Sequence, residues 1–486
     1  MSGQSINLGE IRRVPRTAVP RPHGLKRDLP LVLYADALIL ATALAVWALK
    51  GGLSQAMTAL GALSSLSLIV LIWFAIQYRT NLSCQGFLVL QAAWAYWYFV
   101  PMLLIAVRGQ VYLDTEPRSF TAARIAQGCF AVLLSKFIST LVYQLMLARP
   151  VISVERLTRW LNRRSYRLPV LPVAAQLALG LVPFLFSGKP LLTAILSSRS
   201  VEGIFPKSNF AGSGGGAGSY LFTFFLISCC LLGFYRFFLY QSGSARWIFF
   251  LLGLTAFAVS TIAIATRTML LATTMPFLTI YLLGSPDRWR SAKVVACLVG
   301  MWMGADILVN LRQQGFLERS AIQDNRSRNL TDNDFFGELL YAMEVVPDQV
   351  PFSYESPVKY ALVTLIPRSL WPNKPVQENA ERVMRIRINY LNGELGGNVL
   401  PGIVGQYWEV AGWLGVIVPG IWLGGAIALL DRLIVAANWH VRYFSFVFIW
   451  ALFISFRTFA LSNLLPALIC TATVLALSRS NRFARN

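Results

Sequence analysis

Acidic residues and histidine are scarce in this chain. Its 486 residues include 22 Asp and Glu against 43 Lys and Arg, and the only histidines are His23 and His440. Charged residues make up 13% of the sequence and apolar residues 56%, with a mean hydropathy of +0.56. This composition excludes an ordinary globular protein and is typical of a polytopic membrane protein.

Cysteine is equally sparse, with six in the whole chain and none between residues 310 and 401. No disulfide framework is therefore predicted for that region. No group of His and Cys has the spacing of a metal-binding motif, so the sequence predicts neither a metal site nor another cofactor.

Long apolar stretches are what the chain has instead. Windows of about twenty residues, each enough to cross ~30 Å of hydrocarbon, can be drawn twelve times. No apolar h-region or cleavage site precedes the first window, so no signal peptide is predicted. The predicted fold class is an all-α polytopic membrane protein with about twelve transmembrane helices. The predicted spans are 31–49, 57–77, 87–107, 122–147, 169–187, 219–240, 247–265, 269–284, 293–309, 402–430, 443–457 and 461–478.

Lys and Arg concentrate in alternate connections, which predicts the orientation of the chain in the membrane. The tail 1–30 and the connection 149–168 carry six basic residues each. Both are therefore predicted to be cytoplasmic, as is the tail 479–486. An extracytoplasmic loop is then predicted at 310–401. It lies between a membrane bundle of about nine spans at 31–309 and the C-terminal spans at 402–478. The net charge of +21 is accounted for by this topology and by anionic membrane lipids, so no nucleic-acid partner is predicted.

Residues 310–401, called the polar segment below, hold ten basic residues and eleven of the chain's acidic residues. This balance predicts a folded helical element that binds a polar ligand. Within it, Asp332 to Val346 reads as a helix with an apolar stripe of Phe335, Leu339 and Met343, capped by Asp332 or Asp334. Paired charges predict a second helix at 378–390. The apolar run 358–366 is too short to span the membrane and is predicted to be a re-entrant or interfacial piece.

Two other features allow two interpretations each. The Gly-rich run 212–218 is either a flexible connector, which we favour, or a phosphate cradle. Lys136 lies near the middle of the fourth span. An intramembrane cation is a functional candidate, although it can equally snorkel or pair with a polar group of a neighbouring helix.

Basic residues also lie at span ends on the predicted outer side. Guanidinium groups bind phosphate oxygens in a bidentate manner, and Lys adds a point charge. Together these residues predict a pyrophosphate site, whereas each alone could be an interfacial anchor. They are Arg267 in ATRTM, Arg368 and Lys374 in IPRSLWPNKP, and Arg457 in SFRTF.

The order of these motifs resembles the Wzy-type polymerases of O-antigen and exopolysaccharide repeat units. A turn with Arg267 in ATRTM, an outer loop ending in IPRxLWPxKP, the Gly-spaced GIVGQYWEVAGWLG and an FR turn follow one another within residues 219–478. Family members often carry Glu before the Tyr of the Gly-spaced motif. Here that position is Gln406, and the nearest acid is Glu409.

The resemblance implies a GT-C-like, metal-independent glycosyltransferase of the bacterial plasma membrane. Such an enzyme joins undecaprenyl-pyrophosphate-linked repeat units, as donor and acceptor, at the outer face and can work with a chain-length regulator. A carboxylate would accept the acceptor's hydroxyl proton, and the candidates are Glu338, Glu344 and Asp348. Aromatic rings could stack on sugars or form the interfacial belt. The stacking candidates are Tyr341, Trp371, Tyr407 and Trp408.

Two alternatives remain. An O-antigen ligase has a similar layout but uses an outer-loop histidine, and both histidines here are predicted to be cytoplasmic. A flippase or transporter suits the number of spans, but the large outer segment and the mostly uncharged span interiors do not favour it.

Overall fold

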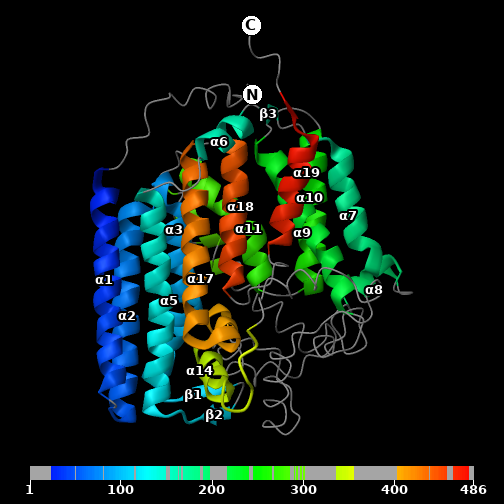
Figure 1. Ribbon diagram of the computed structural model, residues 1–486. Helices are drawn as coiled ribbons and strands as arrows, with labels where there is room; N and C mark the ends of the chain where they lie inside the picture. The colour runs from blue at the N-terminus through cyan, green and yellow to red at the C-terminus, as the bar shows by residue number, and fades with distance from the viewer. Residues whose placement is uncertain are drawn as a thin grey trace.

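The computed structural model is a bundle of helices with two very short strand pairs (Figure 1). It describes residues 23–49, 51–79, 81–113, 116–148, 154–162, 164–165, 168–186, 190–196, 216–239, 245–264, 267–284, 335–354, 402–436, 438–456 and 464–480, with short pieces between 289 and 300. Arg368, Trp371, Lys374 and Arg457 lie outside the described residues, as do the helix predicted at 378–390, the interfacial piece and the proposed capping residues of the 332–346 helix.

Five helical stretches are long and apolar enough to cross a membrane, and six shorter apolar helices accompany them among the described residues. The long stretches are α1 (His23–Ala48), α2 (Leu53–Tyr78), the run η2 (Leu82–Cys84), α3 (Gln85–Trp94), η3 (Ala95–Phe99) and α4 (Val100–Arg108), α5 (Ala122–Ala148), and α17 (Gly402–Ala436). The shorter ones are α7 (Val170–Leu185), α9 (Gly216–Leu239), α10 (Ala245–Ile264), α11 (Arg267–Gly284), α18 (Trp439–Ser455) and α19 (Leu465–Leu477).

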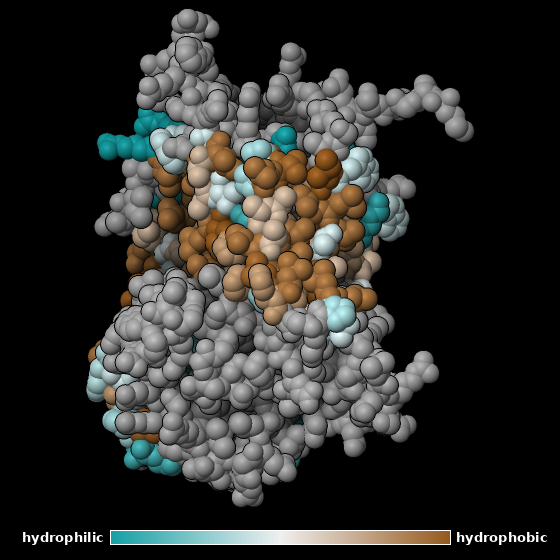
Figure 2. Space-filling view, turned by 90° about the vertical axis from the view of Figure 1, so that its right-hand side faces the viewer, coloured by the Kyte–Doolittle hydropathy of each residue, from teal (hydrophilic) through white to brown (hydrophobic). Residues whose placement is uncertain are grey.

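These helices confirm a helical membrane protein. Each predicted span overlaps a described helix, except 293–309, most of which lies outside the described residues. Large apolar side chains such as Leu38 and Ile69 point away from the protein. A continuous apolar band crosses the face shown in Figure 2, as expected of a surface that contacts lipid.

Two hydrophobic cores hold the bundle together. The first joins α1 to α5 with α17 and part of α18, and the second joins α7, α9, α10, α18 and α19. In the first core α17 packs most extensively against α5. A side chain at Gly420 would come within 2.6 Å of the Ser135 carbonyl oxygen, so the helices approach closely only because this position is glycine.

The two ends of the bundle carry different elements (Figure 1). At one end lie the short helix α6 (Val154–Asn162), the pair β3 (Arg164–Ser165) with β4 (Arg479–Ser480), and the start of α18. We call this the α6 end. At the opposite end lie α14 (Phe335–Val345), the pair β1 (Val111–Leu113) with β2 (Glu116–Arg118), and the start of α17. We call this the α14 end. The short helix α8 (Leu191–Leu196) follows α7.

Two spans are less regular than predicted. The third contains a π turn at Ala95–Phe99, where α3 passes into α4. Such turns insert an extra residue into a helix and are frequent at functional sites. The tenth span breaks at Ala411 and Gly412, whose backbone angles are not helical. The span predicted over 402–430 lies within α17, but this break was not predicted from the sequence.

Candidate active site

Helix α14 lies where the sequence predicted a helix in the polar segment, and it packs on the bundle. The apolar stripe of Phe335, Leu339 and Met343 is buried against the bundle. The rest of the helix is also largely covered, because α5 and α17 pack against it. Gly128 of α5 leaves the room that Leu340 occupies. Part of the polar segment is therefore an integral part of the bundle core.

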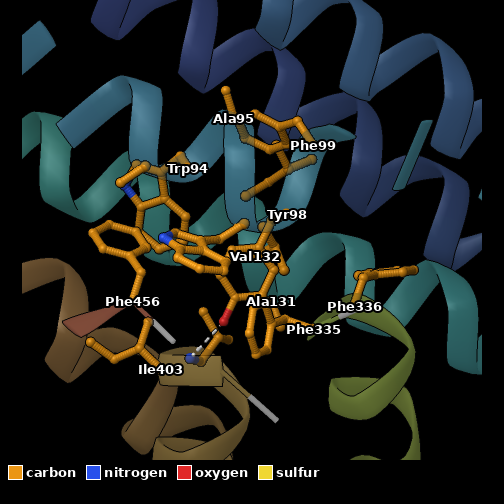
Figure 3. Packing of buried hydrophobic residues seen from close by; sticks show 14 of the residues in the cluster. Trp94, Ala95, Tyr98, Phe99, Ala131, Val132, Phe335, Phe336, Ile403 and Phe456 are labelled. Atoms are coloured by element: carbon orange, nitrogen blue, oxygen red, sulfur yellow. Dashed lines mark hydrogen bonds between the residues drawn. The ribbon is translucent and has the colours of Figure 1, made fainter. Parts of the chain in front are cut away.

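The start of α17 is held by residues from two distant helices. The Ile403 N–H donates to the Phe456 carbonyl at 2.9 Å, and the Val404 N–H donates to the Tyr98 hydroxyl at 3.0 Å (Figure 3). These acceptors satisfy backbone donors that a helix start leaves unpaired. Gly402 has φ +63°, and a Cβ there would lie 2.5 Å from the Tyr98 hydroxyl. This first glycine of the Gly-spaced motif is thus required by its backbone conformation.

The break in α17 is bridged by the chain that leaves α14. The Ser353 N–H donates to the Glu409 carbonyl at 3.1 Å, and the Tyr354 N–H donates to the Val410 carbonyl at 2.9 Å. Gly412 has φ +57°, and the Phe352 ring packs against it. Residues 350–354 therefore supply the hydrogen bonds that carbonyls lose where a helix is interrupted.

The contact between the end of α14, the residues that follow it and the first part of α17 is called the junction below. The Trp408 side chain also holds this junction together. Its indole N–H donates to the Val346 carbonyl at 3.1 Å. The ring lies 5.3 Å from Trp413 in an edge-to-face arrangement, and Trp413 contacts Trp47 at 5.4 Å. The chain that leaves α14, the first part of α17 and the C-terminal end of α1 are thus joined by one aromatic cluster.

Four carboxylates lie at or next to this junction. Glu409 and Glu338 are only 3% and 4% exposed, Glu344 is partly buried, and Asp348 is exposed. A buried carboxylate is costly unless it is paired or can take up a proton. A carboxylate in such a setting can act as a general base towards a hydroxyl group.

Glu409 was not among the acids chosen from the sequence as bases. Those acids were sought only in the polar segment, whereas Glu409 lies just inside the following span. A lone acid within the apolar run Gly402 to Gly415 is the signal that could have identified it.

The aromatic candidates for sugar stacking are packed inside the protein. Tyr341, Tyr407 and Trp408 are 3%, 5% and 4% exposed, and Trp371 lies outside the described residues. The three described rings shape the junction between α14 and α17 and present little open face to a ligand.

The structure describes the basic candidates for the pyrophosphate site only in part. Arg267 begins α11, but only its backbone is described. Arg457 directly follows Phe456, whose carbonyl holds the start of α17. Phe456 of the FR turn thus lies beside the start of the Gly-spaced motif. The convergence of Arg267, Arg368, Lys374 and Arg457 on one pocket stays a prediction.

No group of three or more His, Cys, Asp or Glu side chains with the arrangement of a metal site occurs among the described residues.

Two further acids lie buried in the spans away from the junction. Asp36 of α1 accepts from the Lys136 ammonium of α5, and its other oxygen accepts from Thr140 at 2.9 Å. Asp431 accepts from the Gly86 and Phe87 N–H groups at 2.6 and 3.0 Å and from the Tyr143 hydroxyl. Asp431 therefore caps α3 from a distant helix, where the helix dipole favours a negative charge.

Comparison of the chain with known protein families, curated proteins and solved structures gives no match.

Proposed function

We propose that the chain is a membrane glycosyltransferase that joins lipid-pyrophosphate-linked oligosaccharide units at the outer face of a bacterial plasma membrane. The observation that carries the proposal is the hydrogen bond from the Ile403 N–H to the Phe456 carbonyl. It joins the Gly-spaced motif to the residue before Arg457, although the two segments are separated by some fifty residues. Ile403 and Phe456, one residue from each of two motifs whose order resembles that of Wzy-type polymerases, are thereby neighbours in space.

The second support is the position of the candidate base. Glu409 lies within this junction, one helical turn or less from the break at Ala411 and Gly412. Non-helical backbone at membrane depth is tolerated where it is buried in protein or lines a water-filled cavity, so such a break suits the wall of a substrate site. In the proposed reaction, a carboxylate takes the proton of an acceptor hydroxyl as the oxygen attacks the anomeric carbon of the donor.

The donor's lipid pyrophosphate leaves as the glycosidic bond to it breaks. Because negative charge develops on the leaving phosphate, cations placed beside it stabilise the transition state more than the ground state. Arg267, Arg368, Lys374 and Arg457 are the proposed cations. Undecaprenyl pyrophosphate as the carrier, the GT-C likeness and a chain-length regulator as partner belong to the same proposal.

A histidine-dependent ligase is less well supported. His440 lies in the first turn of α18, where the preceding Asn438 N–H donates to the Asn162 side chain of α6. His23 begins α1. Both histidines are therefore at the α6 end, opposite the junction (Figure 1).

A transporter is favoured by one observation, the buried pair of Asp36 and Lys136. Intramembrane ion pairs often mark translocation paths. The span interiors were expected to be mostly uncharged, with Lys136 as an intramembrane charge, and Asp36 and Asp431 are buried in the helices as well. Both oxygens of Asp36 are already bonded to α5, however, which also suits a structural role.

The test is to incubate the purified protein with lipid-pyrophosphate-linked oligosaccharide units. A polymerase yields lengthened glycan together with free lipid pyrophosphate. In vesicles carrying the same lipid, a flippase moves the lipid across the bilayer and leaves the glycan unchanged. Transfer of glycan to a different acceptor without elongation would instead identify a ligase.

A further inference from the structure

Helix α6 (Val154–Asn162) lies in a basic connection and differs from the other helices in composition. Its sequence, VERLTRWLN, contains apolar, cationic and polar residues, and the helix is too short and too polar to cross a membrane. Such helices lie along a membrane surface when one side is apolar and another is basic.

One side of α6 is attached to the protein. Thr158 is buried, and Leu161 packs on the second core. The Asn162 side chain accepts from the Asn438 N–H at the start of α18, at 3.0 Å. The helix is therefore held in a fixed orientation at the α6 end of the bundle (Figure 1).

The remaining surface of α6 is divided into an apolar strip and a cationic strip. Leu157 and Trp160, three positions apart, are 38% and 46% exposed. Arg156 and Arg159, also three positions apart, are exposed beside them. Residues three apart lie on one side of a helix, so each pair forms a continuous strip. Trp is favoured where hydrocarbon meets headgroups, and Arg where the headgroups carry negative charge.

We propose that this face of α6 binds anionic phospholipid headgroups of the membrane leaflet at the α6 end. Leu157 and Trp160 enter the boundary of the acyl chains, and Arg156 and Arg159 bind the phosphates. The only acid in the helix is Glu155, and the same connection carries Arg149, Arg163, Arg164 and Arg167, so the charge of this region complements an anionic surface. This inference does not depend on the proposed glycosyltransferase activity.

The experiment places an environment-sensitive fluorophore on Leu157→Cys in a Cys297→Ser background. Cys297 is the one exposed cysteine, and the other five are buried. The protein is reconstituted in lipid nanodiscs with increasing fractions of phosphatidylglycerol in phosphatidylcholine. We expect the emission to shift to the blue as phosphatidylglycerol increases, and the shift to weaken at about 1 M salt, where charges are screened within ~3 Å.

Substitution separates lipid binding from a structural role. Arg156→Gln with Arg159→Gln should raise the phosphatidylglycerol fraction needed for the shift, corresponding to about thirtyfold weaker binding. Arg156→Lys with Arg159→Lys should keep most of the response, because a diffuse anionic surface requires charge more than bidentate geometry. The matched control is Arg108→Gln with Arg124→Gln at the α14 end, which should leave the response unchanged.

Three outcomes would overturn the proposal. One is an equal blue shift of the emission in pure phosphatidylcholine. Another is loss of the blue shift in the control variant with Arg108→Gln and Arg124→Gln. The third is a shift produced by inorganic phosphate alone, which would indicate a site for a free anion. A fluorophore on Leu38→Cys, which is 70% exposed in α1, should report the same apolar setting in both lipids and so verifies reconstitution.

Discussion

The Lys136 ammonium of α5 donates a hydrogen bond to the Asp36 carboxylate of α1, and both side chains are almost completely buried. Thr140 donates to the second oxygen of Asp36, and Gln91 of α3 donates to Thr140 at 3.3 Å. Three helices are thus connected by one polar chain inside the hydrophobic core. Removing one member leaves the others buried without compensation.

We therefore expect Asp36→Asn to destabilise the protein by about 3–5 kcal/mol, because Lys136 would be left as an unpaired charge. Thermal unfolding in detergent, followed by loss of the monodisperse peak after heating, measures the change. Asp36→Leu combined with Lys136→Met removes both charges and should recover most of the stability. If the double variant were as unstable as Asp36→Asn, an unpaired charge would not be the cause.

Gly402 offers a second test of the structure. Its φ of +63° and the 2.5 Å approach of a Cβ to the Tyr98 hydroxyl both oppose any side chain. Gly402→Ala should cost about 1–3 kcal/mol and reduce activity, since it displaces the start of α17. Gly52→Ala is the control, because Gly52 has φ −70° and open space around it. It should change stability by less than about 0.5 kcal/mol.

The spans were predictable because a long apolar run has few alternatives to a membrane helix. Helix α14 was predictable for a similar reason, since Phe335, Leu339 and Met343 repeat at helical spacing. The break at Ala411 and Gly412 was not, because it is stabilised by the N–H groups of Ser353 and Tyr354, about sixty residues earlier in the chain. Local pattern contains no information about such a partner.

The candidate site shows the same limit. Sequence order identified the Gly-spaced motif and the FR turn, but their contact through Ile403 and Phe456 follows from the packing of α17 on α18. Lys136 was recognised as an intramembrane cation. Its partner Asp36 lies one hundred residues away and was absorbed into an apolar window, so the pair became visible only once α1 packed on α5.

Glu409→Gln tests the base of the proposed reaction. The amide is of similar size but cannot accept a proton in this way, so glycan elongation should fall by about a hundredfold or more while the protein stays folded. Elongation is measured with the purified protein and lipid-linked units. Asp348→Asn changes the exposed acid among the bases proposed from the sequence and should retain most of the activity if Glu409 is the base. If Glu338→Gln or Glu344→Gln abolished elongation and Glu409→Gln did not, the base would lie on α14.

Arg368→Lys tests the role assigned to the guanidinium groups. Lys keeps the charge but provides no planar pair of donors, so elongation should fall by about tenfold or more. Lipid binding should weaken less than turnover. A chelator should leave elongation intact under the same conditions. Activity that disappears with chelator and returns with a divalent ion would contradict the arginine-based account and direct attention to Asp332, Asp334 and Glu338.

The last prediction concerns sidedness. Ser165 lies in β3, which pairs with β4 at the α6 end, whereas Asp348 follows α14 at the opposite end. Cysteines introduced at these positions in a Cys297→Ser background should therefore react with an impermeant maleimide from opposite sides of the membrane. The Lys and Arg distribution predicts that Asp348→Cys reacts in intact cells and Ser165→Cys only after permeabilisation. Reaction of both from one side would contradict the arrangement of the bundle. The reverse assignment would preserve the bundle but place the junction around Glu409 in the cytoplasm, where the proposed transfer between lipid-linked units at the outer face could not occur.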